Sequence, residues 1–327
     1  MKMNDLATVW DLPTPWHIEP MSGSSHNHLA LIVAANNQHA VLCTYGHDQP
    51  QLLEYMLAVT SVSATLDLPF AVPNPLLTTS GERLYRHDDG YRTWLMSMMP
   101  WLPGEHPTPD DTNACHQAGH AFGRLLTVLA SVAVTPPAPV AWLNLHRIHA
   151  YIIDPLAALR AAPLSSEHVL HIIQVVETLQ QQLPSLYEQL PQQIIHGDMV
   201  PRNVLMLNET VSAILDFEWC RWDVRVVDVA IALLAWGGFG GHFDEAAMRH
   251  FVRGFHDVIP LSDDEIAAIP TMMRLVYVVR LLQVLGRYQQ GTERSVAVER
   301  VAHAFIELDA WLTEIPDFAT SYQNWLA

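Results

Sequence analysis

The chain has 327 residues and 17 basic side chains, of which only Lys2 is a lysine and the other 16 are arginines. With no lysine after Lys2, enzymes that form a Schiff base on a buried lysine are excluded. A Walker A loop is excluded too, because it requires Gly-Lys-Ser/Thr. Half of the residues are hydrophobic and 16% are charged, which indicates a globular protein.

The net charge of −17 disfavours binding to nucleic acid or to anionic membranes. Cys43, Cys115 and Cys220 show no pairing pattern, as expected in a reducing cytosol. The N-terminal residues contain no apolar signal core, and the longest apolar stretch, 226–239, is too short to span a bilayer. We therefore expect a cytoplasmic protein that binds neither nucleic acid nor a membrane, while the sequence leaves its oligomeric state open.

The first hundred residues are expected to form strands and one helix. Apolar segments 29–34 and 39–45 flank a polar pair of asparagines and predict a hairpin. Residues 51–66 predict a helix whose only acidic residue is Glu54. Residues 82–87 and 92–99 predict two further strands joined by a turn.

Four prolines between residues 100 and 109 mark the predicted domain boundary, since neither a helix nor a central strand tolerates them. We expect one domain over residues 1–99 and a second over residues 100–327.

Helices predominate in the expected second domain. Hydrophobic residues recur at helical spacing over 122–132. Ser262 and Glu265 predict a capping box that opens a helix, and residues 305–312 predict a last helix. One island of strands is expected among these helices, with segments 203–207 and 211–215 joined by a tight turn.

The residues that flank this strand pair carry the predicted chemistry. A tight turn brings the outer ends of two strands together, so Asn203 and Asp216 are expected to be neighbours, with Asp198 on the entering loop. Mg²⁺ prefers such oxygen ligands and shares them with phosphate and water. We therefore predict Asn203 and Asp216 as metal ligands and Asp198 as the base that accepts a proton from an attacking hydroxyl.

Three further residues of this segment have predicted roles. His196 is expected to brace the loop by hydrogen bonding, and Gly197 to permit its tight path. For Glu218, a second metal or phosphate role and an ordinary surface carboxylate remain equally open.

The pattern His-Gly-Asp-x4-Asn over 196–203, followed by Ile-Leu-Asp-Phe-Glu over 214–218, resembles a known family. It is similar to the aminoglycoside phosphotransferase and choline kinase-type superfamily of small-molecule kinases, and within it to the homoserine-kinase-like branch. The resemblance implies an α+β, bilobal protein kinase-like fold, with a small antiparallel-sheet N-lobe and a large, mainly helical C-lobe. It also implies transfer of a phosphoryl group from ATP or GTP, with Mg²⁺, to a hydroxyl of a small molecule.

The resemblance further implies a set of nucleotide-binding positions. Residues 21–28 occupy the place of the nucleotide-covering loop, and Glu54 matches the glutamate that orients a phosphate-binding lysine. Segment 95–99 resembles the hinge, with Met96 as gatekeeper and the Ser97 carbonyl and Met99 amide on adenine. The remaining implied positions are Gly23 and Ser24 in the covering loop, and Leu205 and Leu215 as the apolar floor.

The sequence departs from the family at one position. Where the family has a lysine or arginine on the strand that matches 41–45, this chain has Cys43, which cannot pair with Glu54 or neutralise phosphates. Glu54 is then expected to lack its usual partner. The substitute cations that the sequence leaves open are Arg83, Arg86, Arg92, His26 and His28. An alternative function is therefore that of a kinase-like pseudoenzyme that binds a nucleotide or another ligand without turnover.

The acceptor is left open between an amino acid such as homoserine, an amino sugar and an amino alcohol. An acceptor carboxylate would need a cation near the motif, and Arg202, Arg221 and Arg225 are candidates. A cationic acceptor would need acids, for which the candidates are Glu218, Asp223, Asp244 and Glu245. Both sets exist, so composition does not decide.

Overall fold

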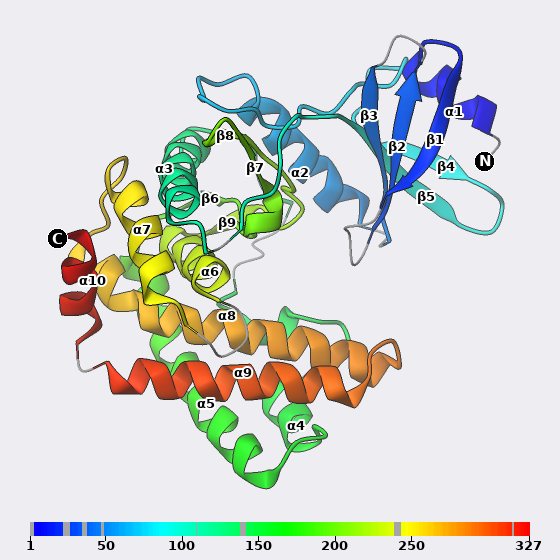
Figure 1. The fold of residues 1–327 in the computed structure, drawn as a ribbon. Helices are drawn as coiled ribbons and strands as arrows, with labels where there is room; N and C mark the ends of the chain where they lie inside the picture. Colours follow the sequence, from blue (N-terminus) through cyan, green and yellow to red (C-terminus); the bar gives the residue numbers. More distant parts are fainter. Residues whose placement is uncertain are drawn as a thin grey trace.

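An antiparallel sheet forms the N-terminal part of the chain, and helices form most of the rest (Figure 1). The computed structural model describes residues 3–21, 27–34, 38–46, 49–108, 110–137, 142–238, 243–315 and 317–327.

The N-terminal sheet has five strands in the order β1-β2-β3-β5-β4. Its strands are β1 (Trp16–Met21), β2 (His28–Ala34), β3 (His39–Thr44), β4 (Tyr85–Asp88) and β5 (Thr93–Pro100). Every neighbouring pair is antiparallel, which confirms the predicted hairpin of the second and third strands and the pairing of the last two. Helix α2 (Pro50–Ser63) follows β3 and confirms the predicted helix. Strand β1 and helix α1 (Met3–Trp10) were not predicted.

The two faces of this sheet contact different partners. Alternate residues of a strand point to opposite faces. Leu42, Met96 and Met98 pack in one hydrophobic cluster with Leu6 and Trp10 of α1. The opposite face carries Cys43, Tyr45 and Leu95, which belong to the larger core that includes α2. The Cys43 face is therefore turned toward the rest of the molecule, and α1 covers the outer face.

The C-terminal part contains most of the helices. They are α3 (Thr112–Leu129), η1 (Leu145–Arg147), α4 (Pro155–Arg160), α5 (Ser166–Gln189), η2 (Pro201–Asn203), α6 (Arg225–Gly237), α7 (Glu245–His256), α8 (Asp263–Gln290), α9 (Ser295–Glu314) and α10 (Phe318–Leu326). The predicted capping box of Ser262 and Glu265 opens α8. The helix predicted at 305–312 is present within α9, but it is not the last one, because α10 follows it.

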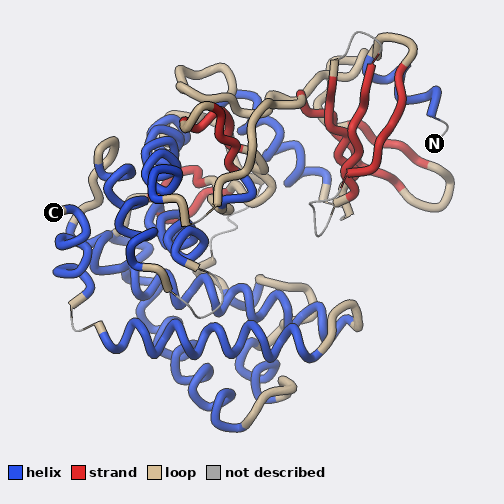
Figure 2. Tube along the Cα trace, viewed as in Figure 1, coloured by secondary structure: helices blue, strands red, loops and turns tan. Residues whose placement is uncertain are grey.

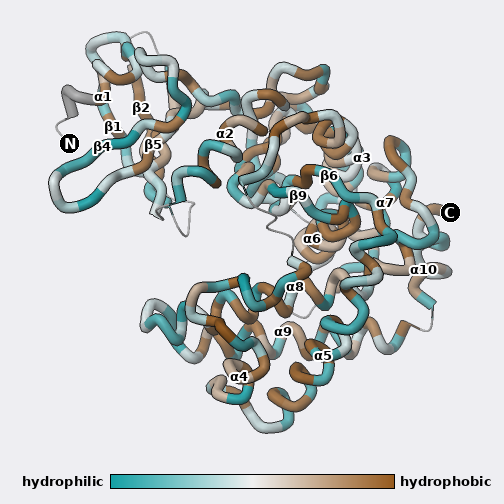
Figure 3. Tube along the Cα trace, turned by 180° about the vertical axis from the view of Figure 1, so that it is seen from behind, coloured by the Kyte–Doolittle hydropathy of each residue, from teal (hydrophilic) through white to brown (hydrophobic). Residues whose placement is uncertain are grey.

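Helix α6 runs through the centre of this region, and hydrophobic colours predominate along it in Figure 3. Nearly all of its residues are buried. Helix α8 packs against both α6 and α9. By length and composition α8 could cross a membrane, but 72% of its most apolar window is buried inside the protein, as in a core helix.

Two small antiparallel strand pairs lie among the helices (Figure 2). The predicted pair is present as β7 (Val204–Leu207) and β8 (Thr210–Ile214), whose turn has positive φ at Asn208 and Glu209. A second pair, β6 (Gln192–Ile195) with β9 (Arg221–Val224), was not predicted. The loop that enters β7 begins at the end of β6, and the loop that leaves β8 leads into β9, so both loops connect the β7–β8 hairpin to the β6–β9 pair.

Candidate active site

The loop between β6 and β7 brings Asp198 and Asn203 into direct contact. The Asn203 side-chain amide nitrogen donates to Asp198 Oδ2 at 2.8 Å and to the Asp198 carbonyl at 2.9 Å. The Asn203 carbonyl accepts the Leu215 amide at 2.8 Å, which ties the start of β7 to the segment after β8. The hairpin therefore places Asp216, the next residue, beside this pair.

Asp216 is in a special conformation and a special environment. Its φ is +62°, which turns the chain sharply at the end of β8. Its side chain is exposed to solvent. The surrounding protein nevertheless removes part of its water and, together with the charges of Glu218 and Asp198, raises the pKa of Asp216 to about 6. Repulsion among three carboxylates is the electrostatic condition that a divalent cation relieves.

His196 and Gly197 fix the conformation of the loop between β6 and β7. The His196 side chain is fully buried; its Nε2 lies 3.0 Å from the Leu215 carbonyl and its Nδ1 accepts the Asp198 amide at 3.2 Å. Burial lowers the pKa of His196, so the ring is neutral. Gly197 has φ +82°, and a Cβ there would lie 2.3 Å from the Trp219 carbonyl oxygen, so only glycine fits.

Asp228 of α6 anchors the same loop. Its two carboxylate oxygens accept the His196 amide at 2.7 Å and the Gly197 amide at 2.8 Å. The side chain is fully buried, and burial raises its pKa to about 7. The first turn of a buried helix thus fixes the position of the loop that carries Asp198.

The donor set at this site suits a hard divalent cation that is shared with phosphate. The side-chain nitrogen of Asn203 donates to Asp198, so the side-chain oxygen of Asn203 is the atom that can bind a metal. The Asp216 side chain is exposed to solvent and can bind a metal as well. Among the described residues, no group of three or more His, Cys, Asp or Glu side chains has the arrangement of a metal site. Asn203 and Asp216 would therefore supply only part of a Mg²⁺ coordination shell, the remainder coming from water and phosphate oxygens.

Cys43 lies on the sheet face that is turned toward these carboxylates. The side chain is buried. Burial, followed by the charges of Glu218 and Asp216, raises the pKa of the thiol far above its usual range. The thiol is therefore neutral and contributes no charge where the family has a cation.

The structure corrects the expectation that Glu54 lacks a partner. Arg86 of β4, one of the predicted substitute cations, lies 2.5 Å from a Glu54 carboxylate oxygen. Both side chains are about half exposed, so the pair contributes little to stability. The partner of Glu54 therefore comes from β4, which is separated from the strand of Cys43, β3, by β5.

The hinge expectation requires a correction as well. Met96 packs with α1 on the outer face of the sheet, so its side chain does not face the site as a gatekeeper would. Tyr45 donates its amide to the Leu95 carbonyl, and alternation along an antiparallel ladder then directs Ser97 and Met99 backbone groups toward β3. These groups are part of the sheet, because β5 extends to residue 100 and the connecting segment begins only after it.

The remaining predicted nucleotide positions lie in different places. Leu205 is buried in β7 and Leu215 is partly buried beside Asn203. Gly23 and Ser24 lie outside the described residues. Next to them, the Asn27 side chain donates to Glu218 at 2.5 Å and accepts the Gly46 amide at 3.2 Å. The start of β2 is thereby tied to the metal motif.

Of the arginines considered for an acceptor carboxylate, only Arg202 is at the site. Its guanidinium lies 2.7 Å from Asp198 Oδ2, and its side chain is 63% exposed. Arg221 is buried, paired with Asp223 and packed over a tryptophan ring. Arg225 forms a buried pair with Glu265.

Two arginines of the long helices were missed in the sequence, and one of them, Arg280, interacts with the base. Arg280 of α8 and Arg300 of α9 interact electrostatically with each other, and Arg280 also interacts with Arg202 and Asp198. No local motif marks them, because they lie 78 and 98 residues after Arg202 and come near each other only through the packing of the long helices.

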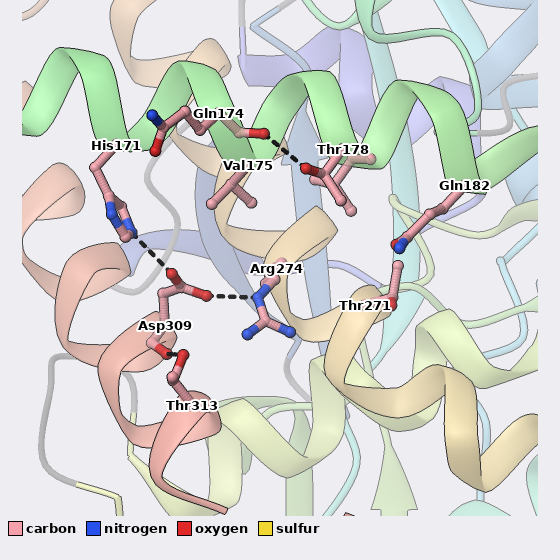
Figure 4. Close-up of a pocket in the computed structure, with 10 residues that line it drawn as sticks. His171, Gln174, Val175, Thr178, Gln182, Thr271, Arg274, Asp309 and Thr313 are labelled. Atoms are coloured by element: carbon pink, nitrogen blue, oxygen red, sulfur yellow. Dashed lines mark hydrogen bonds and ion pairs between the residues drawn. The ribbon is translucent and has the colours of Figure 1, made fainter.

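A separate pocket of about 350 Å³ lies between α5, α8 and α9 (Figure 4). At its floor, Asp309 accepts from Arg274 Nε at 2.5 Å and lies 2.8 Å from His171 Nε2. Both carboxylate oxygens are thus occupied by side chains from two other helices. The arrangement fastens three helices together.

The sequence is similar to a family of enzymes over most of its length. A family model described as the phosphotransferase enzyme family matches residues 17–261. The homoserine kinase of Rhodospirillum rubrum is 27% identical over 248 residues, covering 75% of this chain and 72% of that protein. The homoserine kinase of Gluconobacter oxydans is 33% identical over 176 residues, covering 53% of each chain.

Solved structures show the same fold at low identity. An aminopropanol kinase associated with a microcompartment superposes with a TM-score of 0.75 at 15% identity, covering 98% of both chains. An amicoumacin kinase in complex with AMP-PNP and Ca²⁺ superposes with a TM-score of 0.72 at 17% identity, covering 98% of this chain and 96% of that one. These similarities confirm the predicted kinase-like fold.

Proposed function

Because this chain belongs to the phosphotransferase enzyme family of small-molecule kinases, we propose that it transfers the γ-phosphoryl group of ATP to the hydroxyl of homoserine or a close relative. The observation that carries the proposal is the contact between Asp198 and Asn203 beside Asp216, at the ends of one hairpin. It unites a carboxylate that can accept a proton with the oxygen donors that a metal-bound phosphate requires.

In the proposed reaction, the acceptor hydroxyl oxygen attacks the γ-phosphorus while the bond between that phosphorus and ADP breaks. Asp198 orients the hydroxyl and takes its proton. Asn203 and Asp216 would hold Mg²⁺, which supplies charge neutralisation to the phosphates when it is bound. His196 and Asp228 are positioning residues, because their hydrogen bonds fix the loop that carries Asp198.

The proposed acceptor is based on the names of the sequence relatives. The matched relatives quoted above are named as homoserine kinases, which makes homoserine the first acceptor to test. The Rhodospirillum rubrum alignment covers 72% of that protein, whereas those with the other homoserine kinases compared cover between 26% and 53% of theirs. We propose ATP as donor, with GTP as the second nucleotide to test, and the cytoplasm as the place of the reaction.

The test of this proposal is a panel of acceptors scored by ADP release with Mg²⁺ and ATP or GTP. Homoserine, an amino sugar and an amino alcohol represent the three acceptor classes. The proposal expects turnover that depends on both the acceptor and Mg²⁺. No ADP release above the acceptor-free rate with any of them would contradict it.

One observation favours a second function, a nucleotide-binding pseudoenzyme. Cys43 provides a buried neutral thiol where the family has its phosphate-binding cation. A thermal-shift titration with ATP and Mg²⁺ separates two outcomes, since a ligand that binds the folded state raises its melting temperature. Metal-dependent stabilisation together with ADP release supports the kinase, and stabilisation without ADP release supports the pseudoenzyme.

A further inference from the structure

The pocket between α5, α8 and α9 is lined mainly by polar side chains, whereas the buried residues of these helices are mostly apolar. Gln174, Thr178 and Gln182 follow one another at four-residue spacing, which places them on one face of α5. Thr271 of α8 and Thr313 of α9 add hydroxyl groups from the other two helices (Figure 4). The volume of about 350 Å³ is within the range of small-molecule sites in proteins.

One side chain in this pocket carries hydrogen-bond donors that no described residue uses. Arg274 of α8 donates from its Nε to Asp309 Oδ1 at 2.5 Å. Its two terminal nitrogens donate to no group among the residues that the structure describes. The side chain is only 24% exposed, so its charge is partly withdrawn from bulk water. A guanidinium group in this state gains from binding an anion, because the anion accepts its remaining N–H groups.

Asp309 of α9 fixes the direction of this guanidinium group. The Asp309 carboxylate is buried, and its second oxygen lies 2.8 Å from His171 Nε2 of α5. The Thr313 hydroxyl donates to the Asp309 carbonyl at 2.7 Å. Because the Nε of Arg274 is held by Asp309, the edge that it can offer to a ligand is the one formed by its two terminal nitrogens. A side chain that is already held in its binding direction loses little entropy when a ligand binds.

The charge and the lining of the pocket indicate the class of anion. Asp309 offsets the charge of Arg274, and no other Asp, Glu, Lys or Arg is among the described residues that line the pocket. A phosphate, with nearly two negative charges, would bring more charge than one partly offset guanidinium group can balance. A carboxylate brings one charge and matches the two terminal nitrogens with parallel hydrogen bonds. The neighbouring amides and hydroxyls suit a ligand that carries hydroxyl groups of its own.

We propose that this pocket is a second ligand site, separate from the active site, that binds a small hydroxylated carboxylate. The two terminal nitrogens of Arg274 bind the carboxylate, and the amides and hydroxyls of the lining residues bind the hydroxyl groups. The pocket shares no residue with the loop that carries Asp198, so the site does not depend on the proposed phosphotransferase function.

The test is a calorimetric titration of the full chain with D-gluconate and with D-gluconamide, in which a neutral amide replaces the carboxylate. We expect D-gluconate to bind with a Kd of about 1 mM or lower, and D-gluconamide to bind about tenfold or more weakly, because the charge-assisted contacts are lost. Arg274→Gln should weaken the binding of D-gluconate by about tenfold or more. Inorganic phosphate is titrated in parallel and should bind more weakly than D-gluconate.

A second variant tests the site without changing the ion pair. The Thr178 hydroxyl donates to the Gln174 carbonyl of its own helix at 2.9 Å, so Thr178→Phe fills the pocket and leaves Arg274 and Asp309 in place. It should abolish the binding of D-gluconate even if Arg274→Gln disturbs the fold. Arg249→Gln, which removes an exposed arginine of α7, is the matched control and should bind D-gluconate as the wild type does.

Four outcomes would overturn the site as proposed. Unchanged binding of D-gluconate in both Arg274→Gln and Thr178→Phe would place that ligand elsewhere in the molecule. Equal affinity for D-gluconate and D-gluconamide would exclude recognition of the carboxylate, and tighter binding of inorganic phosphate would assign the pocket to another anion. Absence of binding by all three at about 10 mM would exclude the site. None of these results depends on ADP release, so this inference and the proposed function can each fail while the other stands.

Discussion

Three neighbouring side chains hydrogen-bond to Asp198, through its carboxylate, its carbonyl and its amide. Arg202 and the Asn203 amide both donate to its Oδ2, while Asn203 also donates to its carbonyl. The neutral ring of His196 accepts its amide. The carboxylate is thus fixed in direction before any acceptor binds, and its second oxygen, to which no side chain of the described residues donates, can take the proton.

Replacing Asp198 should abolish proton transfer without removing the metal-binding groups. We expect Asp198→Asn to lower kcat by about 10²–10⁴-fold, as is typical of the loss of a general base. The melting-temperature shift caused by Mg-ATP should persist, because Asn203 and Asp216 remain. Asp257→Asn, at an exposed carboxylate of the α7 C-terminus, is the control. Turnover of Asp198→Asn close to that of the wild type would disprove the role.

Cys43 is the residue at which a cation should matter most. Its thiol interacts with the charges of Asp216 and Glu218, so an ammonium group at this position would have carboxylates nearby. We expect Cys43→Lys to tighten Mg-ATP binding about tenfold in calorimetry, the equivalent of one charge-assisted contact. Cys43→Ala controls for packing. Unchanged affinity in Cys43→Lys would mean that another cation, such as Arg86, already serves the phosphates.

Among the helices, α6 and α8 are joined at their first residues by a buried ion pair. Arg225 opens α6 and donates to Glu265 with two nitrogens, at 2.8 Å and 2.5 Å. Glu265 also accepts the Ser262 amide in the capping box, so one carboxylate serves both helices. Since Asp228 lies one turn further along α6, this junction also supports the catalytic loop.

Removing one partner of this pair should leave the other buried and unpaired. We expect Glu265→Ala to lower the free energy of unfolding by about 3–5 kcal/mol in urea denaturation. Ser262→Ala, which removes only the cap, should cost about 1 kcal/mol. In a double-mutant cycle, the variant that carries both Arg225→Met and Glu265→Ala should lose less free energy of unfolding than the sum of the losses in the two single variants. Additive costs would show that the two residues do not interact.

At the scale of the whole molecule, stability depends on how many protons the folded state binds. Burial raises the pKa of Asp228 from 3.8 to about 7. Between these values the folded protein keeps a proton that the unfolded chain has lost. The stability that this group contributes is therefore present at low pH and is lost as the pH rises through 7.

Comparison with Asp228→Asn isolates this contribution, because the amide does not titrate. The variant should be less stable than the wild type, since one backbone amide then faces a donor. The difference in free energy of unfolding should be larger at pH 5 than at pH 8, by about 1–3 kcal/mol. Urea denaturation at the two pH values measures it, and a difference that is equal or larger at pH 8 would refute the raised pKa.

Features encoded within a few residues could be predicted from the sequence. The pattern of residues 196–203 and 214–218 indicated the kinase-like fold and the β7–β8 hairpin, because a tight turn determines which ends meet. The capping box of α8 was equally local. Helix α1 and strand β1 were not found, since each depends on burial against a sheet formed by later residues.

Features that depend on packing between distant segments were decided only by the tertiary structure. The strand of Met96 was predicted, but the extent of β5 and the position of α1 determined which face it occupies. The partner of Glu54 was one of several open candidates until β4 placed Arg86 against it. Arg280 and Arg300 carry no local pattern at all, because electrostatic contact requires only proximity in space. The sequence by itself determined the fold family and the groups around Asp198, whereas the folded chain decided which charges surround them.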